Sequence, residues 1–395
     1  MTTPDPIRCI CFDAGGVIVK HHRSWEQACL ATGIPLKEGH SEPERVAARR
    51  ALHARYTVGA IGCDEFYASL AAACAGLYSE REVRTLHHHW ITGEYEGVGE
   101  IIARLNRLAS VETALLSNTC ATHWERMLPG GGMSAEFPSI SLLRHKHASH
   151  LMGHAKPDEA IYRAFEVATG FLAGEILFFD DLPENIRAAR ERGIPVSCDL
   201  NFRGKLWRWE SNCSPRDLAT REMQSLLPWV THLVGGREDA AEMLGIRPRT
   251  PPRADDTPDP EAAIDVAQQI HSRFPQLDWI AMTQRETVSA LHHRWGGFLY
   301  DTRAGRAHWA PVSGDGQYSP YSITHIVDRV GGGDAFSAGL LQCWTSEGFA
   351  DPARAVAFAT AASCLAHSIE GDANLVTQAE VEALIAGSGS GRLRR

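Results

Sequence analysis

The sequence lacks three features that would place it in large classes of proteins. Positive charge is not in excess, since 39 Lys and Arg stand against 48 Asp and Glu, and this argues against nucleic acid as a partner. No apolar run approaches the roughly 18 residues that span a bilayer, which argues against a membrane protein. The N-terminus MTTPDPIRC has no basic stretch followed by an apolar one, so we predict no secretory signal and a cytoplasmic location.

Cysteines at redox or metal-binding spacing are also missing. The ten cysteines are scattered, none lies in a CxxC pair, and several stand inside apolar runs. We therefore expect free, buried thiols in a reducing compartment. The remaining composition is ordinary for a globular protein, because 44% of the 395 residues are hydrophobic and 22% are charged. That length suits two or three domains.

Short apolar runs alternate with helical stretches along the chain, which predicts an α/β protein. In the first half, apolar runs end in polar residues at Asp13, at Ser117-Asn118 and at Asp180-Asp181. Buried strands with polar ends predict an open parallel sheet whose site lies at the carboxyl ends of the strands. Residues 20–95 carry Ala, Glu, Arg and Leu at helical spacing and predict a helical insertion without a strand.

We predict one domain at residues 1–195, a second at 196–386 and a flexible tail at 387–395. In the second domain the strand-like runs lie at 196–199, 231–234, 279–283 and 298–300. No linker separates the domains, because a helix at 184–192 leads directly into the run 196–199. That strand would have to serve both domains, so we expect either one incomplete sheet or two continuous ones.

Four polar groups at strand ends or in loops predict a phosphoryl-transfer site. Asp13 precedes two glycines, where a carboxylate can act as a nucleophile and a phosphate can approach the backbone. Ser117-Asn118 offer hydroxyl and amide donors, and Lys156 offers a positive charge. Asp180-Asp181 supply the hard oxygen ligands that suit Mg²⁺.

These motifs resemble a known family. FDAGGVIV, LLSNT, HAKPDEAIYRAF and ILFFDDLPENIRAARERGI are similar to motifs I to IV of the haloacid dehalogenase (HAD) superfamily, with the insertion placed like a C1-type cap. The resemblance covers residues 7–195 and implies that Asp13 attacks phosphorus, that Ser117 and Lys156 hold the phosphoryl group, and that water hydrolyses the acyl phosphate. The Mg²⁺ site that it implies comprises Asp13, the Gly15 carbonyl, Asp180 and Asp181, with Asn185 in support.

One position departs from the pattern of most phosphatases in that family, which carry a second Asp two residues after the nucleophile as general acid and base. Here that position is Gly15. General acid catalysis contributes roughly 10²–10⁴-fold, so we predict slower turnover or substrates with good leaving groups. The dehalogenase branch works without Mg²⁺, so the paired Asp180-Asp181 favours a phosphatase.

A second constellation lies at residues 328–336 (DRVGGGDAF). Three glycines at a helix N-terminus present backbone N–H groups to an anion, and an acid directly after them can take a proton from a hydroxyl. A glycine-rich turn capped by Asp334 is the simpler interpretation of this segment alone.

Further segments resemble the ribokinase-like (PfkB) sugar kinases, closest to the 2-keto-3-deoxygluconate kinase branch. They are SCDLNFRGKLW (197–207), MTQRE (282–286), RWG (294–296), VDRVGGGDAFSAGLL and HSIEGDANLVT. The resemblance covers about 196–380 and implies ATP and Mg²⁺ as cofactors, Asp334 as catalytic base and Asp372 near the site. The phosphate and cofactor contacts that it implies are Asn201, Arg203, Gly331, Gly332 and Gly333.

Two departures from the kinase pattern stand out. The usual Asn-x-x-Glu element has Gly236 in place of Asn and Asp239 as its last acid. The part of such kinases that carries the sugar pocket precedes DxNxR, and here a phosphatase-like domain stands in its place. The His-rich segments 87–89 and 145–150 have no supporting acid or Cys at ligand spacing, and we predict a solvated helix or loop for them.

Together these observations predict an α/β protein: a HAD-type Rossmann-like parallel sheet with a helical C1 cap, joined to a partial ribokinase-like domain. The predicted function is a Mg²⁺-dependent phosphatase of a small phosphorylated metabolite, such as a sugar phosphate, with an ATP-binding kinase segment. The alternatives are a sugar kinase whose sugar half comes from another chain, a non-catalytic nucleotide-binding or regulatory fusion, and a fusion without a settled function. The expected partners are a phosphorylated small molecule and ATP, and a homo-oligomer is left open.

Overall fold

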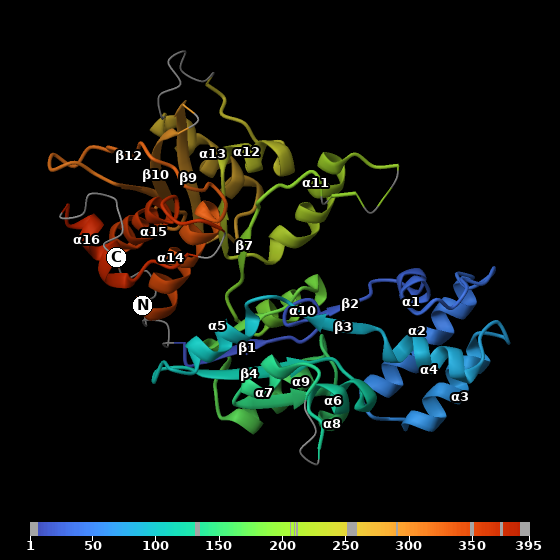
Figure 1. Ribbon diagram of the computed structural model, residues 1–395. Helices are drawn as coiled ribbons and strands as arrows, with labels where there is room; N and C mark the ends of the chain where they lie inside the picture. Colours follow the sequence, from blue (N-terminus) through green and yellow to red (C-terminus); the bar gives the residue numbers. More distant parts are fainter. Residues whose placement is uncertain are drawn as a thin grey trace. The chain divides into compact units, whose positions relative to one another are not determined.

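The computed structural model divides the chain into two compact units, Ile7–Ile194 and the part from Pro195 onward, which are described separately (Figure 1). The structure describes residues 7–130, 135–205, 207–208, 210, 212–250, 259–289, 291–347, 351–371 and 374–387. Asp372, residues 251–258 and all but the first residue of the predicted tail lie outside these residues. No helix in the described part of the chain is long and apolar enough to cross a membrane.

The first unit is built on a four-stranded parallel sheet in the order β5-β4-β1-β6. Its strands are β1 (Cys9–Phe12), β4 (Glu112–Ser117), β5 (His145–Ala148) and β6 (Ile176–Phe179). In register, Phe12 at the end of β1 lies opposite Leu115 of β4 and Phe179 of β6. The residues that follow β1, β4 and β6 therefore meet at one edge of the sheet, where the sequence predicted the site.

Alternate residues of β1 face opposite cores, as a pleated strand requires. Cys9 and Cys11 pack with α9 (Glu159–Thr169) and α10 (Pro183–Glu191), whereas Phe12 packs with α5 (Val98–Leu105), α6 (Ala121–Met127) and α7 (Pro138–Leu142). This burial explains the uninterrupted apolar run in the sequence, because both faces of a parallel sheet are covered by helices. All ten cysteines are free, and most are buried.

The insertion after β1 forms a small helical body with its own core. It contains α1 (Trp25–Thr32), α2 (Pro43–Thr57), α3 (Cys63–Ala73) and α4 (Glu80–His88). Tyr56, Phe66 and Leu86 are fully or nearly fully buried in that core. The prediction of a purely helical segment is wrong at its base, where β2 (Val19–His21) pairs with β3 (Ile91–Glu94). Strands this short, paired across the whole insertion, leave no periodic signal in the sequence.

The second unit contains a six-stranded mixed sheet in the order β11-β10-β9-β8-β7, with β12 also paired to β10. Its strands are β7 (Ser197–Asp199), β8 (His232–Gly235), β9 (Trp279–Ser289), β10 (His292–Asp301), β11 (Arg306–Ala310) and β12 (Tyr321–Ile323). The β7, β8 and β9 strands are parallel, whereas β10 is antiparallel to β9, β11 and β12. The junction strand β7 is placed in this sheet only, beside β8, so the first unit has four strands in its described sheet.

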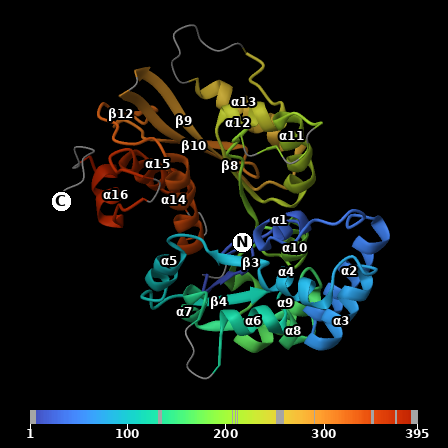
Figure 2. The same cartoon turned by 45° about the vertical axis from the view of Figure 1, so that its right-hand side comes forward.

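Helices cover both faces of the second sheet (Figure 2). The α14 (Gly332–Glu347), α15 (Pro352–Ala366) and α16 (Gln378–Ile385) helices lie together on one face, and α11 (Pro215–Leu226) and α13 (Pro260–Arg273) lie on the other. Phe336 and Ala359 are completely buried against the sheet in the first of these layers. Gly339 lets α14 approach α15, because a Cβ there would lie 2.7 Å from the Ala359 Cα.

The sequence analysis did not predict three strands in addition to those at the base of the insertion. β11 and β12 are short and border loops. β5 lies in the His-rich segment predicted to be a solvated helix or loop, and the prediction for its first four residues is wrong. His145, Lys146 and His147 are only partly buried because β5 is an edge strand, so polar side chains are tolerated there.

Candidate active sites

The centre of the first site is a buried ion-pair chain of two carboxylates and one ammonium group. Lys156 Nζ lies 3.1 Å from Asp13 Oδ1 and 2.6 Å from Asp180 Oδ2. The side chains of Lys156 and Asp180 have no exposed surface, and that of Asp13 is 9% exposed. Asp13 comes from the end of β1 and Asp180 from the end of β6, so sheet register brings them together.

Every atom of the Asp180 carboxylate is occupied by a donor. Its Oδ1 accepts hydrogen bonds from Leu182 N at 2.9 Å and Asn185 Nδ2 at 2.8 Å, and its Oδ2 accepts from Lys156 and Asn185. Asn185 is 1% exposed and sits in the first turn of α10. We predicted Asp180 as a member of the metal site; in the structure its Oδ2 also holds Lys156 in place, and its ligand oxygen lies within 4.8 Å of those of Asp13 and Asp181.

Lys156 is also held through its backbone. Asn118 Nδ2 donates to the Lys156 carbonyl at 2.7 Å, and Lys156 N donates to Asn118 Oδ1 at 2.8 Å. The Asn118 amide, predicted to face a phosphoryl group, is thus used to fix the loop that carries the lysine. Ser117, at the end of β4, is 2% exposed.

Electrostatics keep a positive charge at the centre of this chain. Burial lowers the pKa of Lys156, but the charges of Asp13 and Asp180 outweigh it, so the net pKa is raised. Burial raises the pKa of Asp13, and the Lys156 ammonium opposes that shift. Asp13 Oδ1 also accepts a hydrogen bond from Ala14 N at 2.7 Å.

Asp181 completes the carboxylate group of the first site. Ligand oxygens of Asp13, Asp180 and Asp181 lie within 4.8 Å of one another. A Cβ at Gly16 would lie 2.3 Å from Asp181 Oδ2, so only glycine, with its φ of +76°, leaves room for this carboxylate beside the turn. Arg23 forms an ion pair with Asp181 Oδ2 at 2.9 Å, a partner that the sequence analysis missed.

The donor set fits a hard divalent cation. Asp13 and Asp181 provide carboxylate oxygens at the sheet edge. Gly15, whose carbonyl is the other predicted ligand, lies in the chain between β1 and Gly16. Asp13 and Asp181 would hold Mg²⁺ directly, whereas Asp180, whose oxygens already accept four hydrogen bonds, stays a predicted member of the site.

Beside Gly15 lies a histidine that the sequence analysis also missed. A Cβ at Gly15 would lie 3.4 Å from His21 Cδ2 and 3.6 Å from His21 Nε2. His21 is the last residue of β2 and is partly exposed. No spacing rule would have found it, because β2 itself was not predicted.

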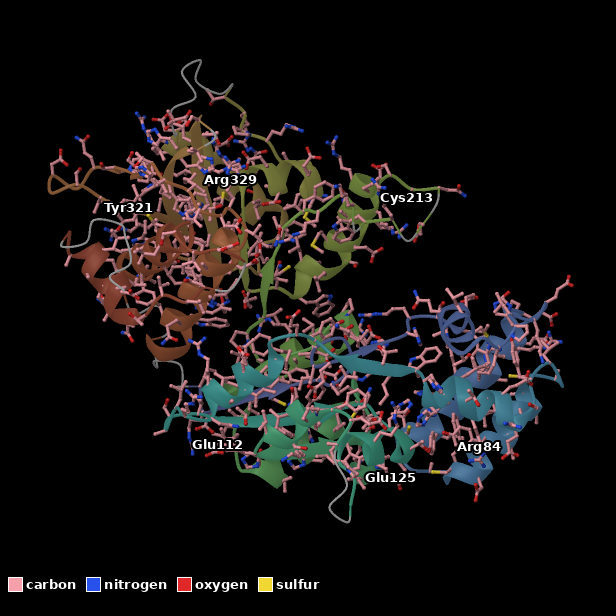
Figure 3. The ribbon with its side chains drawn as sticks, in the orientation of Figure 1. Arg84, Glu112, Glu125, Cys213, Tyr321 and Arg329 are labelled. Carbon is pink, nitrogen blue, oxygen red and sulfur yellow. The ribbon has the colours of Figure 1, made fainter. Side chains whose placement is uncertain are left out.

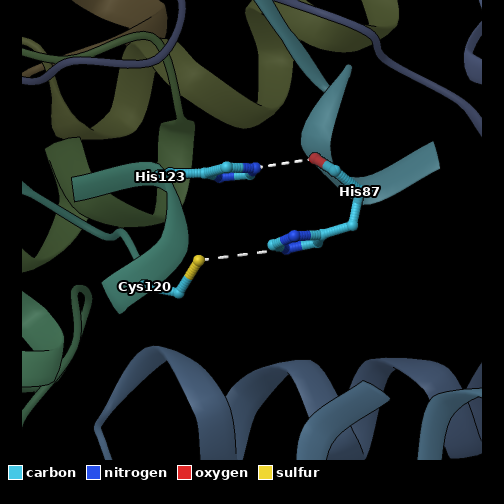
Figure 4. Close-up of side chains that lie close together, drawn as sticks. All are labelled: His87, Cys120 and His123. Atoms are coloured by element: carbon cyan, nitrogen blue, oxygen red, sulfur yellow. Dashed lines mark hydrogen bonds between the residues drawn. The ribbon is translucent and has the colours of Figure 1, made fainter. Parts of the chain in front are cut away.

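A second group of possible ligands, His87, Cys120 and His123, lies buried beside the helical insertion (Figure 4). The two imidazole rings are stacked at 4.2 Å with an interplanar angle of 7°. Ring lone pairs lie in the ring planes, so two parallel rings cannot both point at one ion. His123 Nε2 donates to the His87 carbonyl at 2.8 Å, and Tyr67 Oη lies 2.9 Å from His87 Nδ1. This group is a hydrogen-bonded core network and does not fit a metal.

Burial in that network has a clear electrostatic effect. It lowers the pKa of His123 to about 4 and that of His87 well below its usual range, and it raises the pKa of Cys120 to about 11. The predicted solvated character of segment 87–89 is wrong for His87, which is 8% exposed. His87 faces the core, whereas His89 is exposed.

The second unit has two adjoining cavities at the carboxyl ends of β7, β8 and β9. The larger, about 310 Å³, is lined by residues that include Asp199, Asn201, Arg203, Gly331, Gly333 and Asp334. The smaller, about 180 Å³, is lined by residues that include Arg237, Arg285, Arg329, His293 and Trp295. Gly236, Asp239, Thr283, Arg329 and Gly333 line both, so the cavities are neighbours (Arg329 is labelled in Figure 3).

The glycine-rich segment forms the start of α14 as predicted from its pattern. Gly331 has a φ of +78°, the helix begins at Gly332, and Asp334 lies in its first turn. A Cβ at Gly332 would lie 2.9 Å from His367 Cε1, whereas Gly333 has open space. The backbone N–H groups of this first turn have no partner within the helix and are available to an anion.

Three acids surround the larger cavity. Desolvation, and then the charges of Asp334 and Asp239, raise the pKa of Asp199 to about 6. Asp239, at the place of the usual Glu, accepts hydrogen bonds from Gly236 N and Phe202 N, both at 2.8 Å. Its carboxylate therefore ties the segment after β7 to the segment after β8. The sequence analysis placed Asn201, Arg203 and Asp334 in one site, and the structure gathers them around one cavity; it missed Arg237, Arg285 and Arg329.

Comparisons with known families agree with this division. A model of the haloacid dehalogenase-like hydrolases matches residues 7–193, and a model of the pfkB family carbohydrate kinases matches residues 180–379. The two matches overlap over residues 180–193, which include α10 and Asp180.

Among individual proteins, a 2-dehydro-3-deoxygalactonokinase of Haloferax volcanii is 28% identical over 244 residues, covering 60% of this chain and 63% of the relative. The structure of a PfkB family carbohydrate kinase from Listeria grayi is 34% identical, with 52% of this chain and 54% of that chain covered and a TM-score of 0.41. A HAD family enzyme from Bacteroides thetaiotaomicron, in complex with magnesium and inorganic phosphate, is 21% identical, with 48% and 91% covered and a TM-score of 0.39. The chain thus spans less than two thirds of either kinase relative.

Proposed function

Because the chain belongs to the pfkB family of carbohydrate kinases over residues 180–379 and carries a haloacid dehalogenase-like hydrolase over residues 7–193, we propose a two-part function. The first unit is a Mg²⁺-dependent phosphatase of a small phosphorylated metabolite, with sugar phosphates as the substrate class. The second unit binds ATP and phosphorylates sugar acids poorly or not at all.

The single observation that carries the phosphatase proposal is the fully buried Lys156 ammonium between Asp13 and Asp180. A buried ion pair that leaves one carboxylate slightly exposed at a sheet edge places a nucleophile beside a fixed positive charge. Both described contacts of the Asp13 carboxylate are made to Oδ1, from Ala14 N and Lys156, so Oδ2 is the oxygen that attacks phosphorus.

The chemistry follows from these groups. Asp13 forms a bond to phosphorus as the bond from phosphorus to the leaving oxygen breaks, and water then displaces Asp13 to release phosphate. Lys156 and Ser117 hold the phosphoryl oxygens, and Asn118 and Asp180 keep Lys156 in position. Mg²⁺ held by Asp13 and Asp181 would neutralise charge on the transferring group.

The test is turnover of a panel of sugar phosphates and sugar-acid phosphates by the full chain, with and without EDTA. We expect EDTA and Asp13→Asn each to abolish release of phosphate, while the circular dichroism spectrum of the variant matches the wild type. Wild-type turnover by Asp13→Asn would contradict the proposal. Full release of phosphate in EDTA would contradict the Mg²⁺ dependence.

For the second unit, the proposal rests on the first turn of α14 together with Arg237, Arg285 and Arg329 at the neighbouring cavity. Backbone N–H groups and guanidinium groups bind phosphates, and Asp334 is placed to take the proton of an acceptor hydroxyl. Orientation of the reacting hydroxyl is worth roughly 7–11 kcal/mol in well-aligned cases. The chain spans only 63% of its kinase relative, so we expect this orientation to be lost.

Gly333 offers a clean test, because a side chain there meets open space. Gly333→Asp places a negative charge at the helix N-terminus and should abolish ATP binding measured by calorimetry, whereas Gly333→Ala should keep it. Unchanged binding by Gly333→Asp would contradict the site. Efficient phosphorylation of 2-keto-3-deoxygluconate by the chain alone would overturn the poor-kinase proposal, and activity restored by a second protein would favour the alternative in which another chain supplies the sugar half.

A further inference from the structure

A histidine side chain lies beside Gly15, the position in the first unit that lacks a carboxylate. Gly15 stands two residues after the proposed nucleophile, where an acidic side chain would reach toward the leaving group of a bound phosphate ester. A Cβ built on Gly15 lies 3.6 Å from His21 Nε2. The imidazole of His21 therefore borders the space into which a side chain at position 15 would project, at van der Waals distance from its Cβ.

The turn after β1 places this imidazole by short backbone bonds. Val19 N donates to the Ala14 carbonyl at 2.7 Å, and Gly16 N donates to the Val19 carbonyl at 3.0 Å. The chain thus folds back on the end of β1 and continues as β2. Pairing of His21 with Ile91 of β3 then fixes the end of β2. His21 is delivered by a strand and not by a free loop, which limits its movement.

The hydrogen bond of the ring determines which nitrogen faces the site. His21 Nδ1 lies 2.9 Å from the His22 carbonyl, and a carbonyl oxygen can only accept, so Nδ1 carries a proton. No described residue makes a hydrogen bond to Nε2. Nε2 is therefore the nitrogen that can give or take a proton, and it lies on the Cδ2–Nε2 edge of the ring, which is the edge beside position 15.

The other titratable groups near Asp13 are already committed. Asp180 accepts hydrogen bonds on both oxygens, and the Lys156 ammonium is shared between two carboxylates. Asp181 is paired with Arg23 and belongs to the proposed cation site. His21 Nε2, by contrast, makes no hydrogen bond to a described residue.

We propose that His21 is the general acid and base of the phosphatase, in place of the carboxylate that position 15 lacks. This inference rests on the proposed phosphatase function. As Asp13 attacks phosphorus and the ester P–O bond breaks, the Nε2 proton passes to the leaving oxygen. The neutral Nε2 then takes a proton from water as that water attacks the acyl phosphate, the bond to Asp13 breaks and phosphate leaves. The imidazole thereby returns to its initial protonation state.

The test compares leaving groups, because only a poor leaving group needs a proton. We expect His21→Asn to lower kcat/KM for alkyl phosphates by roughly 10²–10⁴-fold, the usual contribution of general acid catalysis, and to change it little for p-nitrophenyl phosphate. His22→Asn is the matched control, because no atom of His22 lies within 4 Å of a Cβ built on Gly15, and it should leave the ratio of the two substrates unchanged.

A rescue variant separates the chemical role from a structural one. His21→Ala frees the space beside position 15, so Gly15→Asp added to it should recover alkyl phosphate turnover. Gly15→Asp alone should gain little activity, because His21 already supplies the proton. A double variant no better than His21→Ala would count against the assignment.

The outcomes distinguish this inference from the function on which it rests. If His21→Asn lowers turnover of both substrates equally, or of neither, His21 is not the proton-transfer group although the enzyme is a phosphatase. If the wild type hydrolyses neither substrate with Mg²⁺ present, the phosphatase function fails and the role of His21 fails with it.

Discussion

Lys156 shows how one residue can decide both stability and chemistry. Its ammonium group is completely buried, and it compensates two carboxylates that would otherwise be unpaired in the interior. Removing one partner of a buried pair leaves an uncompensated charge, which is more costly than the pair is favourable. Lys156 therefore stabilises the fold in addition to its proposed contact with the phosphoryl group.

We predict that Lys156→Met destabilises the first unit by about 3–5 kcal/mol and abolishes phosphatase activity. Adding Asp180→Asn should recover part of the stability, because one fewer carboxylate is left unpaired, but none of the activity. Chemical denaturation of the full chain, followed by hydrogen exchange of β1 and β6, measures the difference. A Lys156→Met variant as stable as the wild type would show that the carboxylates become protonated at little cost.

Glycine is required at position 16 because the Asp181 carboxylate lies close to it and because its φ is positive. Gly16→Ala would place a Cβ 2.3 Å from Asp181 Oδ2 at a φ of +76°. We expect the displaced Asp181 to weaken Mg²⁺ binding by about 10–100-fold, as loss of ligand orientation does in other metal sites. Gly33→Ala is the control, because Gly33 has a φ of +69° but nothing within 4 Å. Calorimetric titration with Mg²⁺ should find the control unchanged, and equal weakening in both variants would attribute the effect to backbone strain.

At the scale of elements, α4 and α6 meet through the stacked imidazoles of His87 and His123 (Figure 4). Burial lowers the pKa of His123 to about 4, whereas an unfolded histidine titrates near 6.5. The unfolded chain therefore binds a proton that the folded chain excludes. This contribution to stability is fully present above pH 6.5 and is lost as the pH falls from 6.5 toward 4.

From these values His123 alone should cost about 2 kcal/mol of local stability between pH 7.5 and pH 5. Hydrogen exchange of the α4 and α6 amides in the full chain measures it. His123→Gln keeps a donor for the His87 carbonyl without a titrating ring, so its exchange should depend less on pH. An equal dependence in the variant would assign the acid sensitivity to other groups.

The α10 helix connects the two constellations along the chain. Asn185, in its first turn, holds Asp180, and β7 after it leads to Asp199 and Asn201 at the larger cavity. Both family models match residues 180–193. A helix followed by a parallel strand is common to both folds, so one such segment can end the first and begin the second without a linker.

At the scale of the whole molecule, each candidate site draws its described residues from one compact unit. We therefore predict that the two functions vary independently. Asp13→Asn should abolish phosphate release and leave the affinity for ATP unchanged, whereas Gly333→Asp should do the reverse. Phosphatase assays and ATP titrations on both variants of the full chain measure this. A variant that impairs both functions while remaining folded would point to coupling between the sites.

The sequence by itself determined the α/β class, the family of each half, the strand ends that carry Asp13, Ser117 and Asp180, and the helix start that carries Asp334. These features are local: a buried run followed by polar residues, or glycines before a helix, can be recognised without knowing what lies nearby. The ten scattered cysteines were likewise enough to predict free thiols.

Only the tertiary structure decided which groups share a contact. It placed β7 in the second sheet alone and paired Asp180 with Lys156. It also brought Cys120 and His123 next to His87. It also set His21 beside Gly15 through two strands too short to predict. Contacts between residues far apart in sequence depend on register, turns and packing, and no local pattern of residue types records these.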